Sequence, residues 1–154
     1  MAIRNILTKE DEVLNKVCKP VEKFDEKLWQ LLDDMAETLY KVRGLGLAAP
    51  QVGVLRRVAI IDVGDGLIEL INPIITNKSG EQRGVEGCLS CPEQWGYVTR
   101  PMNCKLKAQD RNGKFYEMDL TELACRCACH EVDHLEGKLF LRLVDEFIEI
   151  EDEE

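Results

Sequence analysis

The chain contains only two histidines, and both lie in the five-residue segment His130-Glu131-Val132-Asp133-His134. Residues four apart on a helix share one face, so the two imidazoles can point at a single metal ion. Glu131 would stand beside that ion, where a carboxylate can move a proton to or from water. The segment therefore predicts a helix with both histidines on one face, where they can bind a metal ion. The chemistry that it indicates is metal-dependent hydrolysis.

The length and composition indicate a single globular domain. At 154 residues the chain is long enough to bury a core. Its 45% hydrophobic and 32% charged residues are the balance of a folded protein. The first residues lack the apolar run of a signal peptide, and no apolar stretch approaches the roughly 20 residues of a membrane span. We therefore expect a cytoplasmic protein that does not associate with membranes.

The formal net charge of -9 is concentrated at the C-terminus. Residues 145–154 contain seven acids and no base, and the rest of the chain has 22 acids against 20 bases. We predict a folded domain over residues 1–144 and a solvated, frayed acidic tail over residues 145–154. Because no basic stripe is present to neutralise phosphates, we expect no direct binding of nucleic acid.

Hydrophobic periodicity and turn residues predict two helices separated by strands. Asp25 is a possible cap of the first helix and Gly44 its stop, and Gly137 closes the second helix. The Asn-Gly pair at 112–113 is a strong hairpin signal. This order favours an α+β fold. The predicted elements are a helix over 25–43, strands over 57–63 and 67–76, a hairpin over 103–110 and 114–120, and a helix over 121–136.

Two histidines do not complete a catalytic metal site, which normally has three protein ligands and an open position. No histidine follows the pair, so the third ligand should come from upstream, and cysteine is the residue type to test. Cys127 shares the histidine face, but it lies about 7 Å along the helix axis from the level of the ion, beyond the reach of a thiol. Cys125 and Cys129 point further round the helix, and we expect all three to pack in the core.

Cys88 and Cys91 are the remaining candidates for the third ligand. Their C-x-x-C spacing is also that of a zinc knuckle or a redox pair. A knuckle needs a second such pair, which the sequence lacks, and Pro92 and Gly96 favour a loop or extended segment over the helix that a redox pair opens. One of the two cysteines is therefore the economical third ligand, and spacing alone favours Cys88 only slightly over Cys91.

Three segments in order along the chain resemble the motifs of the peptide deformylases, which remove the formyl group from the amino terminus of new bacterial-type proteins. The segments are GLGLAAPQ at 44–51, EGCLS at 86–90 and HEVDHL at 130–135, and the similarity extends over residues 3–143. The resemblance implies that residues 1–144 are a catalytic α+β domain. Antiparallel sheets would pack around the central metal-binding helix, with a further helix in the N-terminal half.

The resemblance also implies the metal site. It makes Cys88 the third ligand, together with His130 and His134. The implied cofactor is one Fe²⁺ per chain, which Zn²⁺, Ni²⁺ or Co²⁺ can replace, although a cysteine and two imidazoles suit zinc equally well. A metal-activated water would be the nucleophile, and Glu131 would act as general base and then general acid.

Further residues are implied to bind substrate and the oxyanion. The Gln51 side-chain amide and the Leu89 backbone N–H would donate to the oxyanion. Gly44, Leu45 and Gly46 would run beside an extended substrate, which pairs like an added strand. The implied substrates are N-formylmethionyl peptides and nascent chains near the ribosome, with an apolar pocket for the methionine side chain. We expect a monomer.

The chain departs from the common family pattern at two positions. Cys129 stands where members often have glutamine, and Trp95-Gly96-Tyr97 occupies the region where many have an arginine that helps to hold the peptide backbone. The chain also ends soon after the motif helix. These differences concern substrate contacts and C-terminal packing rather than the chemistry. Two interpretations of Asp133 stay open. It either supports the metal ligands, or it is a carboxylate that faces solvent or pairs along the helix.

Two other functions fit parts of the pattern. A metallopeptidase with the same histidine–glutamate motif would require a ligand downstream of His134 and would cleave peptide bonds. A non-enzymatic metal-binding or redox-sensing protein would use Cys88 and Cys91.

Overall fold

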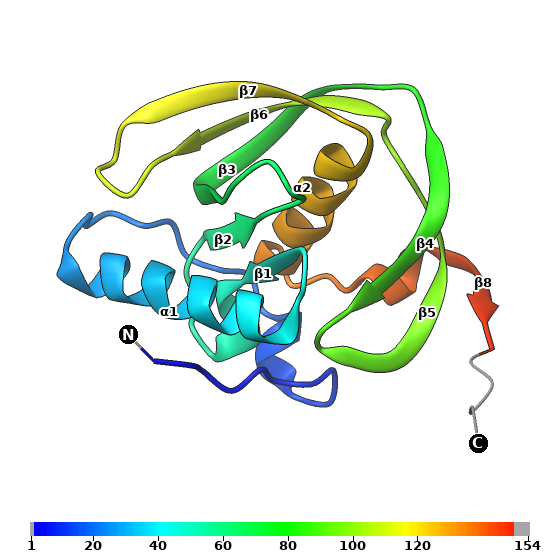
Figure 1. Cartoon of the computed structure of the whole chain (residues 1–154), viewed down its shortest axis with the longest axis horizontal. Helices are drawn as coiled ribbons and strands as arrows, with labels where there is room; N and C mark the ends of the chain where they lie inside the picture. The colour runs from blue at the N-terminus through cyan, green and yellow to red at the C-terminus, as the bar shows by residue number, and fades with distance from the viewer. Residues whose placement is uncertain (1, 150–154) are drawn as a thin grey trace.

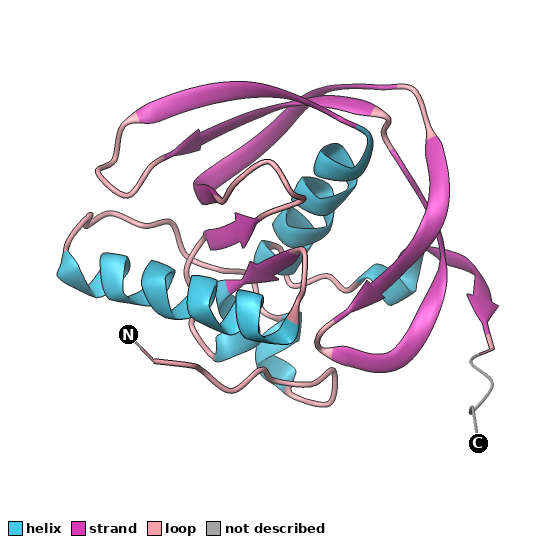
Figure 2. Cartoon of the chain, in the orientation of Figure 1, coloured by secondary structure: helices cyan, strands magenta, loops and turns pink. Residues whose placement is uncertain are grey.

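The computed structural model describes residues 2–149, in which two α-helices are combined with eight strands (Figures 1 and 2). Three short 3-10 helices connect them. In chain order the elements are η1 (Glu12–Asn15), α1 (Glu26–Val42), β1 (Gly46–Ala48), η2 (Ala49–Val52), β2 (Val58–Ile61), β3 (Ile68–Ser79), β4 (Gln82–Cys88), β5 (Cys91–Arg100), β6 (Asn103–Gln109), β7 (Phe115–Thr121), α2 (Glu122–Leu135), η3 (Phe140–Leu143) and β8 (Val144–Ile148).

The strands form two antiparallel sheets around α2. One sheet has the order β1-β2-β3-β6-β7 and the other the order β4-β5-β8. Helix α2 occupies the middle of the molecule and packs against strands of both sheets, while α1 covers β1 and β2 (Figure 1). The predicted α+β fold, with antiparallel sheets around the histidine-bearing helix, is confirmed. Within residues 2–149, no helix is both long and apolar enough to span a bilayer.

Helix α1 forms where the periodicity predicts it. Its buried side chains recur at helical spacing and meet the inner residues of β1 and β2 in one apolar cluster. Asp25 caps the helix by accepting a hydrogen bond from the Leu28 N–H. At the other end the left-handed residue is Arg43, with φ 56°, so the residue that turns the chain is one position before the predicted stop at Gly44.

Strands β4 and β5 were not predicted, and β8 contradicts part of the expected tail. Residues Asp145 to Ile148 are not frayed, because they lie in β8, which pairs with β5 at Trp95 and its neighbours. The Asp145 carboxylate also pairs at 2.6 Å with Arg83 on β4, the strand on the other side of β5. Residues 150–154 of the acidic segment lie outside the described residues, and the division at residue 144 stays a prediction.

Candidate metal centre and active site

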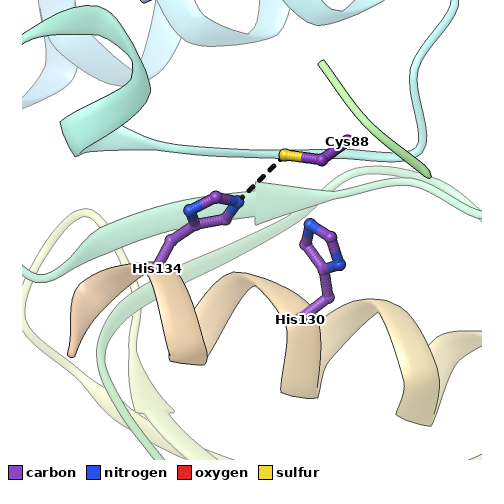
Figure 3. A group of neighbouring side chains, drawn as sticks. All are labelled: Cys88, His130 and His134. Carbon is purple, nitrogen blue, oxygen red and sulfur yellow. Dashed lines mark hydrogen bonds between the residues drawn. The ribbon is translucent and has the colours of Figure 1, made fainter. Parts of the chain in front are cut away.

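The structure brings Cys88, His130 and His134 together, as Figure 3 shows. Cys88 ends β4, and the two histidines lie one turn apart on α2. One ligand atom from each residue lies within 4.8 Å of the others, and the Cys88 sulfur is 3.4 Å from His134 Nε2. Burial lowers the pKa of His134 well below its usual range, so its imidazole stays neutral, which is the form that binds metal. One thiol and two imidazoles are a ligand set that suits Fe²⁺ or Zn²⁺.

Two buried polar atoms at this cluster have no hydrogen-bond partner within residues 2–149. They are Glu131 Oε1 and His134 Nδ1. A buried polar atom without a partner costs free energy, so native proteins rarely keep one unless a water, ion or ligand completes the site. The unpaired oxygen of Glu131 therefore fits a group that acts on a molecule bound beside the cluster.

Glu86 holds His130 in position. The His130 Nδ1–H donates to Glu86 Oε1 at 2.9 Å, which leaves Nε2 free for an ion. Arg100 donates to both oxygens of the same carboxylate, and Arg126 donates to one of them. Burial alone would raise the pKa of Glu86, but the bonds from His130 and Arg100 outweigh it and lower the pKa to about 2. Glu86 is thus a buried carboxylate that orients a candidate ligand.

Asp133 belongs to the same buried network. Its carboxylate accepts a hydrogen bond from Arg100 Nη1 at 2.7 Å, and Arg142 lies 3.3 Å from the same oxygen. Arg100 therefore connects Asp133 with Glu86, which supports the reading of Asp133 as an indirect support of the ligands. Sequence reasoning missed Arg100 and Arg126, and the only available signal was that Glu86, two residues before Cys88, would need cationic partners if buried.

Glu131 is almost fully buried beside the histidines. Burial raises the pKa of its carboxyl to about 7. A carboxyl group that titrates near neutral pH can both accept and donate a proton. This property fits the general base and acid that the sequence motif implies.

Gly46 of β1 leaves the room that the Glu131 carboxylate occupies. A β-carbon at position 46 would lie 2.5 Å from Glu131 Oε2, which is closer than side chains tolerate. Gly46→Ala is therefore expected to displace the Glu131 carboxylate. The kcat/KM of the hydrolysis that the motif predicts should fall on the order of 100-fold for a shift of about 1 Å. Steady-state kinetics would measure this loss, with metal content and melting temperature as controls. Wild-type kinetics in a folded Gly46→Ala protein would contradict this close contact.

The Gln51 side chain points at the cluster from η2. Its Oε1 accepts from the Ala48 N–H at 2.9 Å, which fixes the orientation of the amide. Its Nε2 donates to Ser90 Oγ at 3.0 Å and lies 3.7 Å from the Cys88 sulfur. Leu89 occupies the turn between Cys88 and Ser90. Gln51 and Leu89 therefore flank the candidate ligand Cys88, although they are far apart in sequence.

A cavity of about 580 Å³ opens beside the cluster. Trp95 lines its mouth and also packs over Gly87, where an added β-carbon would lie 2.3 Å from the ring. Trp95 therefore both lines the cavity and packs against β4. The lining includes eight of the nine candidate site residues, all except His134: Gly44, Leu45, Gly46, Gln51, Cys88, Leu89, His130 and Glu131.

The cysteines that sequence reasoning assigned to packing are buried. Cys125, Cys127 and Cys129 are 0–8% exposed, and Cys127 also lines the cavity. Cys91 is buried in β5, opposite Cys88 in the β4–β5 pairing. None of these four sulfurs belongs to the cluster of Cys88 and the histidines.

Comparison with known proteins identifies the family. The model of the polypeptide deformylase family matches residues 3–148 of the chain. The chain belongs to the polypeptide deformylase family. A peptide deformylase from Caldicellulosiruptor bescii is 53% identical over 99% of this chain and 92% of the relative. The crystal structure of peptide deformylase from Thermotoga maritima has a TM-score of 0.92 at 40% identity, covering 94% of this chain and 99% of that one.

Further similarity to solved deformylases agrees with this assignment. A peptide deformylase from Ehrlichia chaffeensis, solved in complex with actinonin, has a TM-score of 0.91 at 35% identity and covers 94% of this chain and 90% of that one. The prediction of an enzyme of this family is confirmed, and the alternative of a non-enzymatic cysteine-pair protein is wrong. The chain is thus a member of the family even though Cys129 and Trp95 differ from the residues that are common in it.

Proposed function

We propose that the chain removes the N-formyl group from N-formylmethionyl peptides and nascent chains, with release of formate. The observation that carries this proposal is the buried Glu131, which has an unpaired oxygen and stands beside a cysteine and two histidines at the cavity. Membership of the polypeptide deformylase family supports the choice of a formyl group over a peptide bond.

Cys88, His130 and His134 would hold the metal ion. When bound, the ion supplies Lewis acidity, which lowers the pKa of water at the site and makes a nucleophile available near neutral pH. Glu131 takes the proton of that water and delivers it to the departing amine nitrogen. The amide bond breaks, and the products are formate and a peptide with a free amino terminus.

Two donors would stabilise the negative charge that develops on the formyl oxygen. One is the Gln51 side-chain amide, whose orientation the Ala48 N–H fixes before substrate arrives. The other is the backbone N–H of Leu89. Donors that are already oriented lower the barrier, because they do not have to reorganise during the reaction.

The substrate would bind as an extended strand along β1. In the described five-stranded sheet β1 is an edge strand that pairs with β2 on one side only. Leu45 and Gly46 of this segment line the cavity, so a peptide that pairs with the free edge enters the site directly. Val85, Leu89 and Leu123 supply apolar walls for the methionine side chain.

The proposed cofactor is one Fe²⁺ per chain, and Zn²⁺, Ni²⁺ or Co²⁺ would replace it. Anaerobically purified iron enzyme is expected to lose activity within minutes to hours of aeration, because Fe²⁺ and the Cys88 thiolate both oxidise. Activity followed in air and under nitrogen measures this loss, and a Ni²⁺-loaded sample serves as the control. If the iron-loaded sample lost activity no faster in air than under nitrogen, the predicted oxidation of Fe²⁺ and the Cys88 thiolate would be contradicted.

The cellular setting follows from the substrate. We propose a cytoplasmic monomer that meets nascent chains near the ribosome and does not bind nucleic acid directly or associate with membranes. Residues 1–144 would form the catalytic domain, to which β8 adds the first residues of the acidic segment.

A peptide assay separates this function from that of a metallopeptidase. The protein is expected to release formate from formyl-Met-Ala-Ser and to leave Met-Ala-Ser intact. Chromatography and a formate assay on the same samples measure both reactions. Cleavage of Met-Ala-Ser without release of formate would establish the metallopeptidase instead.

A further inference from the structure

A second cluster of possible metal ligands lies in the core, apart from the site described above. The sulfurs of Cys104, Cys125 and Cys129 all lie within 4.8 Å of one another, and those of Cys104 and Cys125 are 3.0 Å apart. All three residues are buried, at 0–7% exposure. Cys104 comes from β6 and the other two from α2, so the cluster joins the large sheet to the helix of the histidines.

The cluster repeats the spacing of the histidine pair on another face of the same helix. Cys125 and Cys129 are four residues apart, like His130 and His134, and on an ideal helix they point about 140° away from the histidine face. Neither these two residues nor Cys104 lines the active-site cavity. The two groups of ligands are therefore separate.

A surface pocket lies next to one member of this cluster. A pocket of about 240 Å³ lies at β6 and β7, and Cys104 forms part of its lining. The other lining residues include Asn103 and Lys105 on either side of Cys104.

We propose that Cys104, Cys125 and Cys129 bind a second, thiophilic divalent ion, of which Zn²⁺ is the representative. In a tetrahedral site with Zn–S bonds of about 2.3 Å the sulfurs lie about 3.8 Å apart, so Cys104 and Cys125 need to separate by less than 1 Å. Three cysteines leave a fourth position, which a water would fill. Soft thiolate ligands select zinc over the harder divalent ions.

Such an ion would fasten α2 to β6. The helix carries Glu131 and both histidines, so a link at Cys125 and Cys129 would limit its movement against the sheet.

Metal counting tests the proposal independently of enzyme activity. Wild-type protein, Cys104→Ala, Cys125→Ala and Cys88→Ala would be purified anaerobically, incubated with excess Zn²⁺, desalted and analysed for zinc per chain. Cys18→Ala is the matched control, because Cys18 is buried but belongs to neither cluster. We expect two zinc ions per chain in the wild type and in Cys18→Ala, one in each of the other single variants, and none in Cys88→Ala/Cys104→Ala.

X-ray absorption of the wild type provides a measurement that needs no variant. Two filled sites give an average of two sulfurs per zinc, because four cysteines share two ions, whereas the catalytic site alone gives one. One zinc per chain in the wild type, or two in folded Cys104→Ala and Cys125→Ala, would overturn the proposal. A Cys104–Cys125 disulfide in protein kept under nitrogen would overturn it as well.

Discussion

Replacing Glu131 with glutamine is expected to lower formate release by about 100- to 10,000-fold, the range for loss of a general acid–base group. Glutamine has nearly the same size and shape, so the buried position stays filled. It cannot accept the proton of the attacking water, however, and it cannot deliver one to the amine. Since Glu131 is not among the clustered candidate ligands, the variant should keep its metal. Measurement of kcat/KM on formyl-Met-Ala-Ser together with metal analysis tests both expectations.

A matched control separates this effect from a general change of charge. Glu117→Gln removes the same charge from an exposed position on β7, and it should keep wild-type activity. If the metal-loaded Glu131→Gln protein is as active as the wild type, Glu131 does not carry the proton and the proposed mechanism is wrong.

Replacing Cys88 with alanine is expected to remove tightly bound metal from the catalytic site and to reduce formate release to background. The sulfur of Cys88 lies 3.4 Å from His134 Nε2, so its loss leaves only two imidazoles, and a catalytic site normally has three protein ligands. Iron per chain after desalting measures the binding, and formate release measures the consequence.

Cys91→Ala is the control for Cys88→Ala. The two cysteines face each other across the β4–β5 turn, and Cys91 is buried, so both substitutions remove a sulfur from the same region. Cys91 does not belong to the ligand cluster, and its variant should therefore keep iron and activity. The opposite result, in which Cys91→Ala loses iron and Cys88→Ala keeps it, would exchange the roles of the two residues.

Helical geometry made part of the site predictable from the sequence. The i, i+4 spacing of His130 and His134 places both rings on one face wherever the helix packs, and the same geometry excludes Cys127 as a ligand. The choice between Cys88 and Cys91 depends instead on how β4 pairs with β5 and meets α2. Spacing along the chain carries no information on that contact, so only the family resemblance favoured Cys88 clearly.

The small sheet and the buried charges were harder to predict. β4 and β5 contain Gly84, Gly87 and Gly96, which interrupt the alternation of apolar and polar residues that marks a strand. Arg100 and Arg126 are charged residues, which are normally exposed, and their ion pairs with the buried Glu86 carboxylate help to explain why they are inside. The proximity of Cys104 to the α2 cysteines likewise depends on sheet packing.

Reconstitution of the metal-free protein tests the central claim most directly. Protein stripped with a chelator under nitrogen would be titrated with Fe²⁺, and formate release from formyl-Met-Ala-Ser would be followed at each addition. The account predicts almost no release without metal, and a rate that rises with iron and levels off at one Fe²⁺ per chain. Full formate release by the metal-free protein, or stoichiometric iron binding without any formate release, would contradict it.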